Sequence, residues 1–301
     1  MGSALPGQDA GTQSRQVRGL FSQRGCIWVL LVPCLLLTAF AFKLFSNARA
    51  MPVVRRMEVA LPYPANVIQR PVTVALITDG HLSGLDNSPQ RMARIVGEVN
   101  GVKPDLILLG GDYIGDHKGG EVYNAEASIA PFAGLRAPMG VLAVLGNHDA
   151  RRHARINHKQ WRQLFARIGI QLLLDEAVRR GPLVIGGLRD IYSDHPNIAG
   201  TLQAMEQLGG AELVLSHGPD VFPVLPDRPL LALVGHTHCG QVALPFKGIV
   251  YVPSRFGTRY ACGAYREGAK TMIVSAGVGT SGLPIRMLSP PDVWLVTIRP
   301  E

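Results

Sequence analysis

The sequence has little charge, no internal repeat and no low-complexity tract after its first residues. Asp, Glu, Lys and Arg make up only 17% of its 301 residues, whereas hydrophobic residues make up 47%. A disordered chain has the opposite balance, so disorder is not expected for most of this one. The chain can bury a sizeable core in one large domain or two small ones.

The chain also lacks a basic surface suited to nucleic acid. Its formal net charge is +8, but residues 1–56 hold seven Lys and Arg residues against one acid, Asp9. The remaining 23 basic and 21 acidic residues nearly cancel. No basic patch interleaved with aromatic residues follows residue 57, so we do not expect nucleic acid as a partner. Basic residues that flank an apolar segment are attracted to anionic lipid instead, which makes membrane lipid the expected partner.

One long uncharged run, GCIWVLLVPCLLLTAFAF, lies between Arg24 and Lys43. As a helix it is just long enough to cross a thin bilayer core. Residues 25–45 are therefore expected to form a single-pass transmembrane helix or signal anchor in the cell membrane. The alternative is a cleaved signal peptide, because Ala48-Arg49-Ala50 resembles a small-residue cleavage site. Basic residues flank the run on both sides, so the positive-inside rule does not choose the side of the membrane.

The rest of the chain divides into a leader, a linker and one domain. Residues 1–24 are rich in Gly, Ser, Gln and Arg without an apolar period, which predicts a disordered leader. Proline recurs through residues 46–70, which we interpret as a linker. Residues 71–301 are expected to form the domain.

Within that domain, strand patterns alternate with helix patterns. Short β-branched runs indicate strands that begin near residues 72, 105 and 141, and residues 88–100 and 121–135 have helical periodicity between them. This alternation predicts parallel β-α-β units, in which ligands collect at the carboxyl ends of the strands. A further helix is expected at 159–169. Later strands, including four short ones after residue 240, suggest a second sheet packed on the first.

Polar residues with metal-binding side chains follow five of these strands. Taken singly, each motif is more typical of a turn or a cap than of a metal site. Together they place a mixed imidazole, carboxylate and amide set at one edge of a sheet, which suits two divalent ions such as Mn, Fe or Zn better than Ca. The residues are Asp79, His81, Asp112, Asn147, His148, His217, His236 and His238.

The order of these motifs, D-x-H, G-D, G-N-H-D, H-G and G-H-T-H, resembles that of the calcineurin-like metallophosphoesterase superfamily. The C-terminal sequence from Gly257 onward is similar to that of its membrane-associated bacterial phosphodiesterase branch. The resemblance covers residues 55–300 and implies an α/β fold, a four-layer α/β/β/α sandwich. It also implies roles for the individual side chains.

By this resemblance, one metal ion is held by Asp79, His81 and His238. A second is held by Asn147, His217 and His236, and Asp112 bridges the two. His148 follows a ligand without being one, so we assign it to transition-state stabilisation or to protonation of the leaving oxygen, with Asp149 as its orienting partner.

Weaker expectations concern substrate contacts and thiols. Arg residues 151, 152 and 266, together with Tyr265, are candidates for contact with a substrate phosphate or leaving group.

Cys239 follows the last ligand and is expected to pack beside the site. The sequence leaves open whether Cys239 forms a disulfide with Cys262 or both thiols stay free.

The function implied is that of a dinuclear-metal phosphoesterase that cleaves a phosphodiester or pyrophosphate at the membrane by attack of a metal-bridging hydroxide. A lipid precursor such as UDP-diacylglucosamine would require a domain that faces the cytoplasm, whereas an envelope phosphodiester would suit an outward-facing one. The alternatives are a nucleotide or nucleic-acid phosphodiesterase and a non-catalytic scaffold of the same fold.

Overall fold

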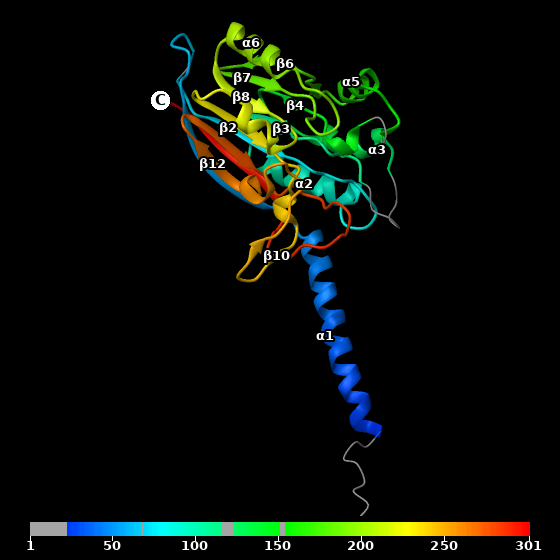
Figure 1. The fold of residues 1–301 in the computed structure, drawn as a ribbon. Helices are drawn as coiled ribbons and strands as arrows, with labels where there is room; N and C mark the ends of the chain where they lie inside the picture. The colour runs from blue at the N-terminus through cyan, green and yellow to red at the C-terminus, as the bar shows by residue number, and fades with distance from the viewer. Residues whose placement is uncertain (1–22, 68, 116–122, 151–153) are drawn as a thin grey trace, which may run out of the picture. The chain divides into compact units, whose positions relative to one another are not determined.

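The chain folds into two units that differ greatly in size. A computed structural model describes residues 23–67, 69–115, 123–150 and 154–301, and the two compact units are Met1–Phe42 and Lys43–Glu301. Helix α1 (Gln23–Arg49) supplies the described part of the first unit, and its last residues belong to the second (Figure 1). Within α1, Leu31–Arg49 is long and apolar enough to cross a membrane, a test that a signal sequence near the N-terminus also passes. The expected leader lies almost entirely outside the described residues.

The second unit is built on two six-stranded sheets. The first sheet runs in the order β1 (Val53–Leu61), β14 (Asp292–Pro300), β2 (Val72–Ile77), β3 (Leu106–Leu109), β4 (Val141–Ala143), β5 (Gln171–Leu172). The second sheet runs in the order β12 (Gly263–Glu267), β13 (Lys270–Val274), β9 (Leu230–Val234), β8 (Ala211–Leu215), β7 (Leu183–Gly187), β6 (Glu176–Arg180). A small hairpin of β10 (Ala243–Leu244) and β11 (Gly248–Ile249) stands apart from both.

Three apolar clusters define the layers of this unit. Strand β3 shows the division, because Leu106 and Leu108 face a cluster between the two sheets whereas Ile107 and Leu109 face helix α2 (Pro89–Gly101). That outer cluster also takes in α3 (Ala125–Ile129) and α5 (His158–Arg167). The third cluster packs α6 (Ile198–Leu208) and the 3-10 turn η3 (Pro219–Val224) on the second sheet. The expected four-layer α/β/β/α sandwich is therefore confirmed (Figure 1).

The expected helix at residues 88–100 is confirmed as α2. Ser88 is the N-cap of α2, its side chain accepts a hydrogen bond from the Arg91 N–H, and Pro89 occupies the first turn. The pattern at 121–135 lies partly outside the described residues. Its described part forms α3 and the 3-10 turn η1 (Ala130–Gly134).

Two expectations at the edge of the first sheet need correction. The segment interpreted as a linker, 46–70, contains the last turn of α1 and all of β1, which pairs in parallel with β14 along its whole length. Charged residues at 55, 56 and 58 hide its apolar alternation, and its prolines flank the strand without interrupting it. The last strand, β14, joins the first sheet and not the second, because its backbone pairs with β1 on one side and β2 on the other while Val296 and Ile298 face the cluster between the sheets.

Strand direction places the polar motifs together. Strands β2, β3, β4 and β5 are mutually parallel, and so are β7, β8, β9 and β13. The carboxyl ends of neighbouring parallel strands lie at one edge of a sheet, which is where ligands bind in such folds. Both sheets contribute such an edge to the same site, as the distances below show.

Candidate metal centre

The backbone is unusual where the polar motifs leave their strands. Five residues there have left-handed φ values: 54° at Asp79, 41° at His81, 55° at Asp112, 70° at His236 and 50° at His238. Such a conformation is unfavourable for a residue with a Cβ and persists only where the surroundings enforce it, typically at functional sites. This concentration of strain at successive strand ends marks the site independently of residue type.

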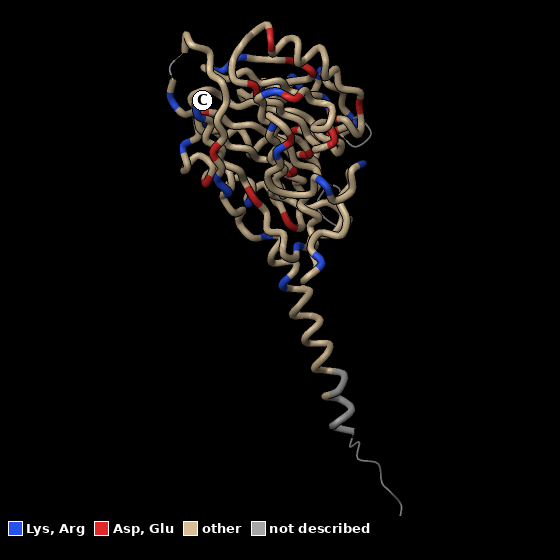
Figure 2. Tube along the Cα trace, turned by 60° about the vertical axis from the view of Figure 1, so that its left-hand side comes forward, with Lys and Arg blue, Asp and Glu red and all other residues tan. Residues whose placement is uncertain are grey.

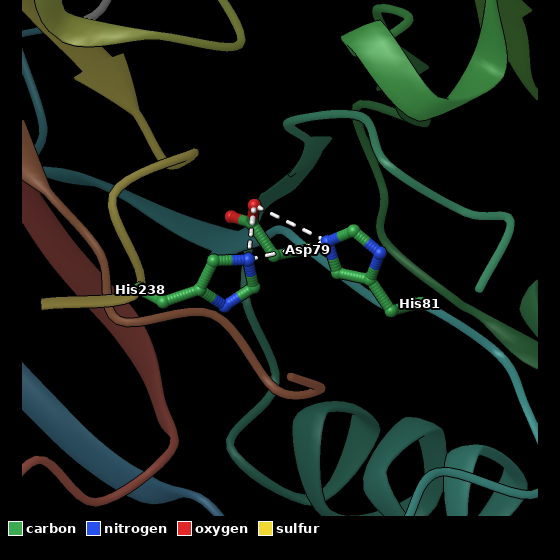
Figure 3. Close-up of side chains that lie close together, drawn as sticks. All are labelled: Asp79, His81 and His238. Atoms are coloured by element: carbon green, nitrogen blue, oxygen red, sulfur yellow. Dashed lines mark hydrogen bonds and ion pairs between the residues drawn. The ribbon is translucent and has the colours of Figure 1, made fainter. Parts of the chain in front are cut away.

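The first cluster contains Asp79, His81 and His238, all buried. The Nε2 atoms of His81 and His238 lie 3.2 Å apart. Asp79 Oδ1 lies 3.5 Å from His238 Nε2 and 4.0 Å from His81 Nε2. Figure 3 shows both imidazole rings directed at the Asp79 carboxylate. Three potential ligand atoms thus converge on one point.

The second cluster contains His217 and His236 with Asn147 beside them. His217 Nε2 lies 3.1 Å from His236 Nδ1 and 3.1 Å from Asn147 Oδ1. Each histidine holds a backbone carbonyl oxygen at 2.8 Å with its other ring nitrogen, Gly110 for His217 and Pro253 for His236. Because a carbonyl only accepts hydrogen bonds, these contacts direct the lone pairs of His217 Nε2 and His236 Nδ1 into the site.

Asp112 lies between the two clusters. A single oxygen, Oδ2, is 3.3 Å from Nε2 of His81 and 3.2 Å from Nε2 of His217. One carboxylate therefore touches a histidine of each cluster. This is the arrangement required of a carboxylate that bridges two ions.

The chemistry of these donors fits cations. Two imidazole lone pairs 3.1 Å apart repel unless a proton or a cation lies between them. Burial lowers the pKa of His217, but the negative charge of Asp112 outweighs burial and holds that pKa well above its usual value. Burial and the charge of His217 lower the pKa of His236 to about 3. Without a metal ion, a protonated His217 therefore faces a neutral His236. A divalent ion can take the place of the proton between the two rings.

The glycines of the motifs provide room for the carboxylates. A Cβ on Gly146, which precedes Asn147, would overlap Asp112 Oδ1. A Cβ on Gly235, which precedes His236, would overlap Asp79 Oδ2. Gly146 is therefore needed for the close approach of two loops of the first sheet, and Gly235 for the close approach of loops from the two sheets.

Asp149 supports two loops of the site through its carboxylate, and its expected role as the orienting partner of His148 stays a prediction. Its carboxylate accepts backbone hydrogen bonds from Asp112, Tyr113 and Gly146 at 2.8–2.9 Å. Burial and the charge of Asp112 raise its pKa to about 7. The role of Asp149 is thus to join the Asp112 loop to the Asn147 loop.

His148 lies at the mouth of the site. Its backbone N–H donates to Asp112 Oδ1 at 2.8 Å, and its ring packs edge-on against the ring of His81 with centroids 4.8 Å apart. It is half-buried, whereas His81 is fully buried. A ligand atom of His148 also lies within 4.8 Å of those of His81 and Asp112.

Of the four residues expected to contact substrate, the structure describes two. Arg151 and Arg152 lie outside the described residues. Tyr265 and Arg266 lie on β12, where register pairs Gly263 with Val274 at the site edge and Arg266 with Thr271 toward the opposite edge. The Tyr265 hydroxyl accepts from the Cys262 N–H, and its ring packs on Tyr260. The structure therefore does not bring Tyr265 or Arg266 into the metal clusters, because β12 runs antiparallel to its neighbour.

Several residues that hold the site were not singled out from the sequence. Arg286 is fully buried, and its guanidinium donates to the carbonyls of Ala276 and Gly279 at 2.7 and 2.6 Å and to that of His238 at 3.4 Å. Tyr192 stacks on His236 with ring centroids 4.0 Å apart. These side chains lie in segments without strand or motif character, so only the tertiary structure reveals them.

A disulfide secures the loop of the last ligand. Cys239, directly after His238, is bonded to Cys262, which precedes β12. The Thr237 hydroxyl adds a hydrogen bond to the Ala261 carbonyl at 2.8 Å. The choice that the sequence left open is resolved in favour of the disulfide, which ties the His238 loop to the edge of the second sheet.

Comparison with known proteins agrees with this geometry. The sequence profile described as calcineurin-like phosphoesterase matches residues 72–240. The metallophosphoesterase YkuE of Bacillus subtilis is 30% identical over 235 residues, which cover 75% of this chain and 78% of that protein. The phosphodiesterase YaeI of Escherichia coli is 30% identical over 207 residues, covering 65% and 71%.

A zebrafish relative is named as a transmembrane protein with a metallophosphoesterase domain. It is 25% identical over 273 residues, which cover 84% of this chain and 59% of the relative. The profile match spans more than half of the chain and includes all seven residues of the two clusters and the bridge. The chain therefore belongs to the calcineurin-like phosphoesterases and is a phosphoesterase hydrolase.

Proposed function

We propose that the protein hydrolyses a phosphodiester or pyrophosphate at the membrane with two divalent metal ions. The observation that carries this proposal is the position of Asp112 Oδ2, which lies 3.3 and 3.2 Å from a histidine of each cluster. Asp79, His81 and His238 would hold one ion, and Asn147, His217 and His236 would hold the other. When bound, the ions supply a nucleophile at neutral pH and neutralise charge on the phosphoryl oxygens. Mn, Fe and Zn suit this donor set.

His148 is the group proposed to serve the leaving oxygen. Its ring lies at the mouth of the site, while its backbone N–H is held on Asp112. A half-exposed imidazole beside the ligands can donate a proton or a hydrogen bond to a departing oxygen without giving up a metal contact. Asp149 fixes the loop that carries His148 by accepting the Gly146 N–H, and it is the proposed orienting partner of His148.

We infer that α1 anchors the catalytic unit and that this unit lies on the oxidising side of the membrane. The Cys239–Cys262 disulfide supports that side, because disulfides persist outside the cytoplasm and are reduced within it. An outward-facing unit favours an envelope phosphodiester over UDP-diacylglucosamine, which would need a cytoplasmic site.

The activity is tested by a substrate screen with the purified full chain. Supplied with Mn, it is expected to hydrolyse bis-aryl phosphodiesters, with weaker action on aryl monophosphates. Glu126→Gln is the control, since Glu126 is exposed and faces Arg167 at 4.0 Å on the surface. Failure to cleave any phosphodiester or UDP-lipid with two metal equivalents bound would instead favour the non-catalytic scaffold.

The side of the membrane is tested by thiol alkylation. Cells that express the full chain are quenched with acid and treated with a maleimide-polyethylene glycol before and after reduction. Two additional thiols are expected to react only after reduction, while Cys34, which is exposed and free, reacts without it. Alkylation of Cys239 and Cys262 without reductant would contradict the oxidising side.

The second candidate function is hydrolysis of a nucleotide or nucleic-acid phosphodiester by the same metal-assisted reaction. Figure 2 shows Lys and Arg positions intermixed with Asp and Glu positions along the trace of the compact unit. Cleavage of a cyclic nucleotide or of DNA faster than a bis-aryl phosphodiester would favour this candidate.

A further inference from the structure

The compact unit exposes six large apolar side chains on two short segments. We call them the apolar rim: Leu244, Phe246, Val250, Tyr251, Leu283 and Leu288. The ring of Phe246 is fully exposed, and Tyr251, Leu283 and Leu288 are each about two-thirds exposed or more, at 73%, 67% and 66%. Single exposed apolar residues are ordinary, but a group of them marks a surface that contacts a partner or a membrane.

The two segments of the rim are joined by backbone contacts. The Ala243 N–H at the start of the β10–β11 hairpin donates to the Met287 carbonyl at 2.9 Å, and Val242 forms a parallel bridge with Met287. Gln241 Nε2 donates to the Leu283 carbonyl at 2.8 Å. The hairpin and the segment 283–288 thus form one continuous surface.

This surface adjoins the point at which the apolar helix enters the unit. The Arg286 N–H donates to the Leu44 carbonyl at 3.0 Å, and Asn47 Nδ2 donates to the Arg286 carbonyl at 3.1 Å. Leu288 is two residues from Arg286 and so at most ~7 Å away along the chain. The segment 283–288 of the rim thus contacts the last turns of α1, which belong to the second unit.

The charge of these segments also suits a membrane. No Asp or Glu stands between Asp227 and Glu267, or between Glu267 and Asp292. Lys247 is exposed at the tip of the hairpin, and Lys43 is exposed at the start of the unit. Apolar side chains bordered by Lys, with no acid among them, match the interface of a bilayer that carries anionic lipid.

The rim is also connected to the metal centre. His238 begins the 3-10 turn η4 (His238–Gly240), which leads directly into the hairpin. After the hairpin, the Pro253 carbonyl accepts from His236 Nε2 at 2.8 Å. Both ends of the segment that carries Phe246 are therefore fixed on proposed metal ligands.

From these contacts we propose that the apolar rim rests on the bilayer that holds α1, and that the metal centre acts on the phosphodiester of an amphiphile lying in that bilayer. The proposal rests on the function proposed above and adds the class of substrate. The occupant of the rim is lipid, because the rim is continuous with the entry point of an apolar helix and lacks acidic residues.

Contact with lipid is tested by quenching of tryptophan fluorescence. Full-length Phe246→Trp in vesicles that contain brominated phospholipid is expected to lose most of the emission that the new residue adds over the wild-type protein. Leu208→Trp is the matched control. Leu208 is also exposed, at 41%, but it ends α6 and precedes the amino end of β8. The metal clusters lie at the carboxyl end of that strand. Equal quenching of the two variants would overturn the proposal.

The consequence for substrate choice is tested with the double variant Phe246→Ser/Leu288→Ser. We expect roughly a tenfold loss of turnover on a phospholipid-like phosphodiester in vesicles, because the two substituted side chains no longer bury apolar surface in the bilayer interface. Turnover of a soluble bis-aryl phosphodiester is expected to stay unchanged.

The outcomes separate the two proposals. If the wild type cleaves neither substrate, the proposed function fails, whatever the quenching shows. If it cleaves the soluble substrate but the double variant acts equally well in vesicles, the membrane contact is wrong. If Phe246→Ser dissociates a dimer in detergent and Phe246→Trp is not quenched, the rim binds a second copy, which also overturns the proposal.

Discussion

The two sheets contribute different chemistry to one site. Loops after the first sheet provide both carboxylates and the amide, with one histidine, from Asp79, His81, Asp112 and Asn147. Loops after the second sheet provide only imidazoles, from His217, His236 and His238. Each cluster takes proposed ligands from both sheets, so neither sheet could build such a site by itself. The packing of the two sheets is what creates the site.

The supports on the two sides differ as well. On the first side, a single buried carboxylate, Asp149, holds four backbone N–H groups of two loops. On the second side, a disulfide and the buried guanidinium of Arg286 hold the His238 loop. The comparison can be tested by removing one bridging, catalytic or supporting group at a time. The substitutions run from the largest expected effect on the site to the smallest.

Removal of the bridge should affect both sides. Asp112→Ala is expected to lose both metal equivalents and to lower turnover by at least roughly a thousandfold, because the carboxylate oxygen that lies beside an imidazole of each cluster is gone. Metal analysis and turnover with Mn provide the measurement, with Glu126→Gln as the control. Two equivalents retained in Asp112→Ala would show that Asp112 is not the bridge.

Removal of His148 should separate chemistry from metal binding. His148→Ala is expected to keep both metal equivalents while turnover falls roughly a hundredfold, in the range for loss of a general acid. The matched control is His158→Ala, because the side chain of His158 is half exposed and faces Asp194 at 3.5 Å on the surface. A loss of metal in His148→Ala would assign His148 to the ligand set instead.

Weakening the support on the first side should have a smaller effect. Asp149→Asn turns an N–H donor toward backbone donors and leaves at least one of them unsatisfied, which costs ~1–3 kcal/mol. We expect a Tm lower by several degrees, since ~1 kcal/mol corresponds to ~2–4 °C in a domain of this class. Metal affinity should fall roughly tenfold or more in a titration. An unchanged Tm would contradict this role.

Removal of the disulfide should affect turnover least. Cys239→Ser/Cys262→Ser is expected to lose about 3 kcal/mol of stability, because the bond closes a loop with a sequence separation of 23. Turnover should stay within roughly tenfold of the wild type at temperatures where the variant is folded, since neither sulfur belongs to a metal cluster. Cys34→Ser serves as the control. Thermal unfolding and turnover are measured together, and complete loss of activity in a folded variant would place the disulfide in the site itself.

Much of the first sheet could be predicted from local sequence. The run VTVALI forms β2 as expected, and Ser88 and Pro89 begin α2 where the capping pattern predicted. The strand β1 could not be recognised, because three charged residues within it obscure its apolar face and its partner β14 lies at the far end of the chain. Long-range pairing of this kind leaves no local pattern to read.

For the site, the residue types that bind metal were visible in the sequence, whereas their supports were not. His217 and His236 stand out as histidines at strand ends, but the carbonyls that set their tautomers belong to Gly110 and Pro253, which no motif identifies. Arg286 was missed because a buried arginine in a loop has the same local sequence as a solvated one.

By itself, the sequence determined which chemistry the chain carries and the strand ends at which that chemistry would appear, because hydrophobic runs and the polar residues that follow them are local properties. Only the tertiary structure decided that Asp112 stands between two clusters, that Cys239 is bonded to Cys262 and that Phe246 remains uncovered. Those facts depend on which segments distant in the chain pack against one another, and packing of the two sheets brings them about.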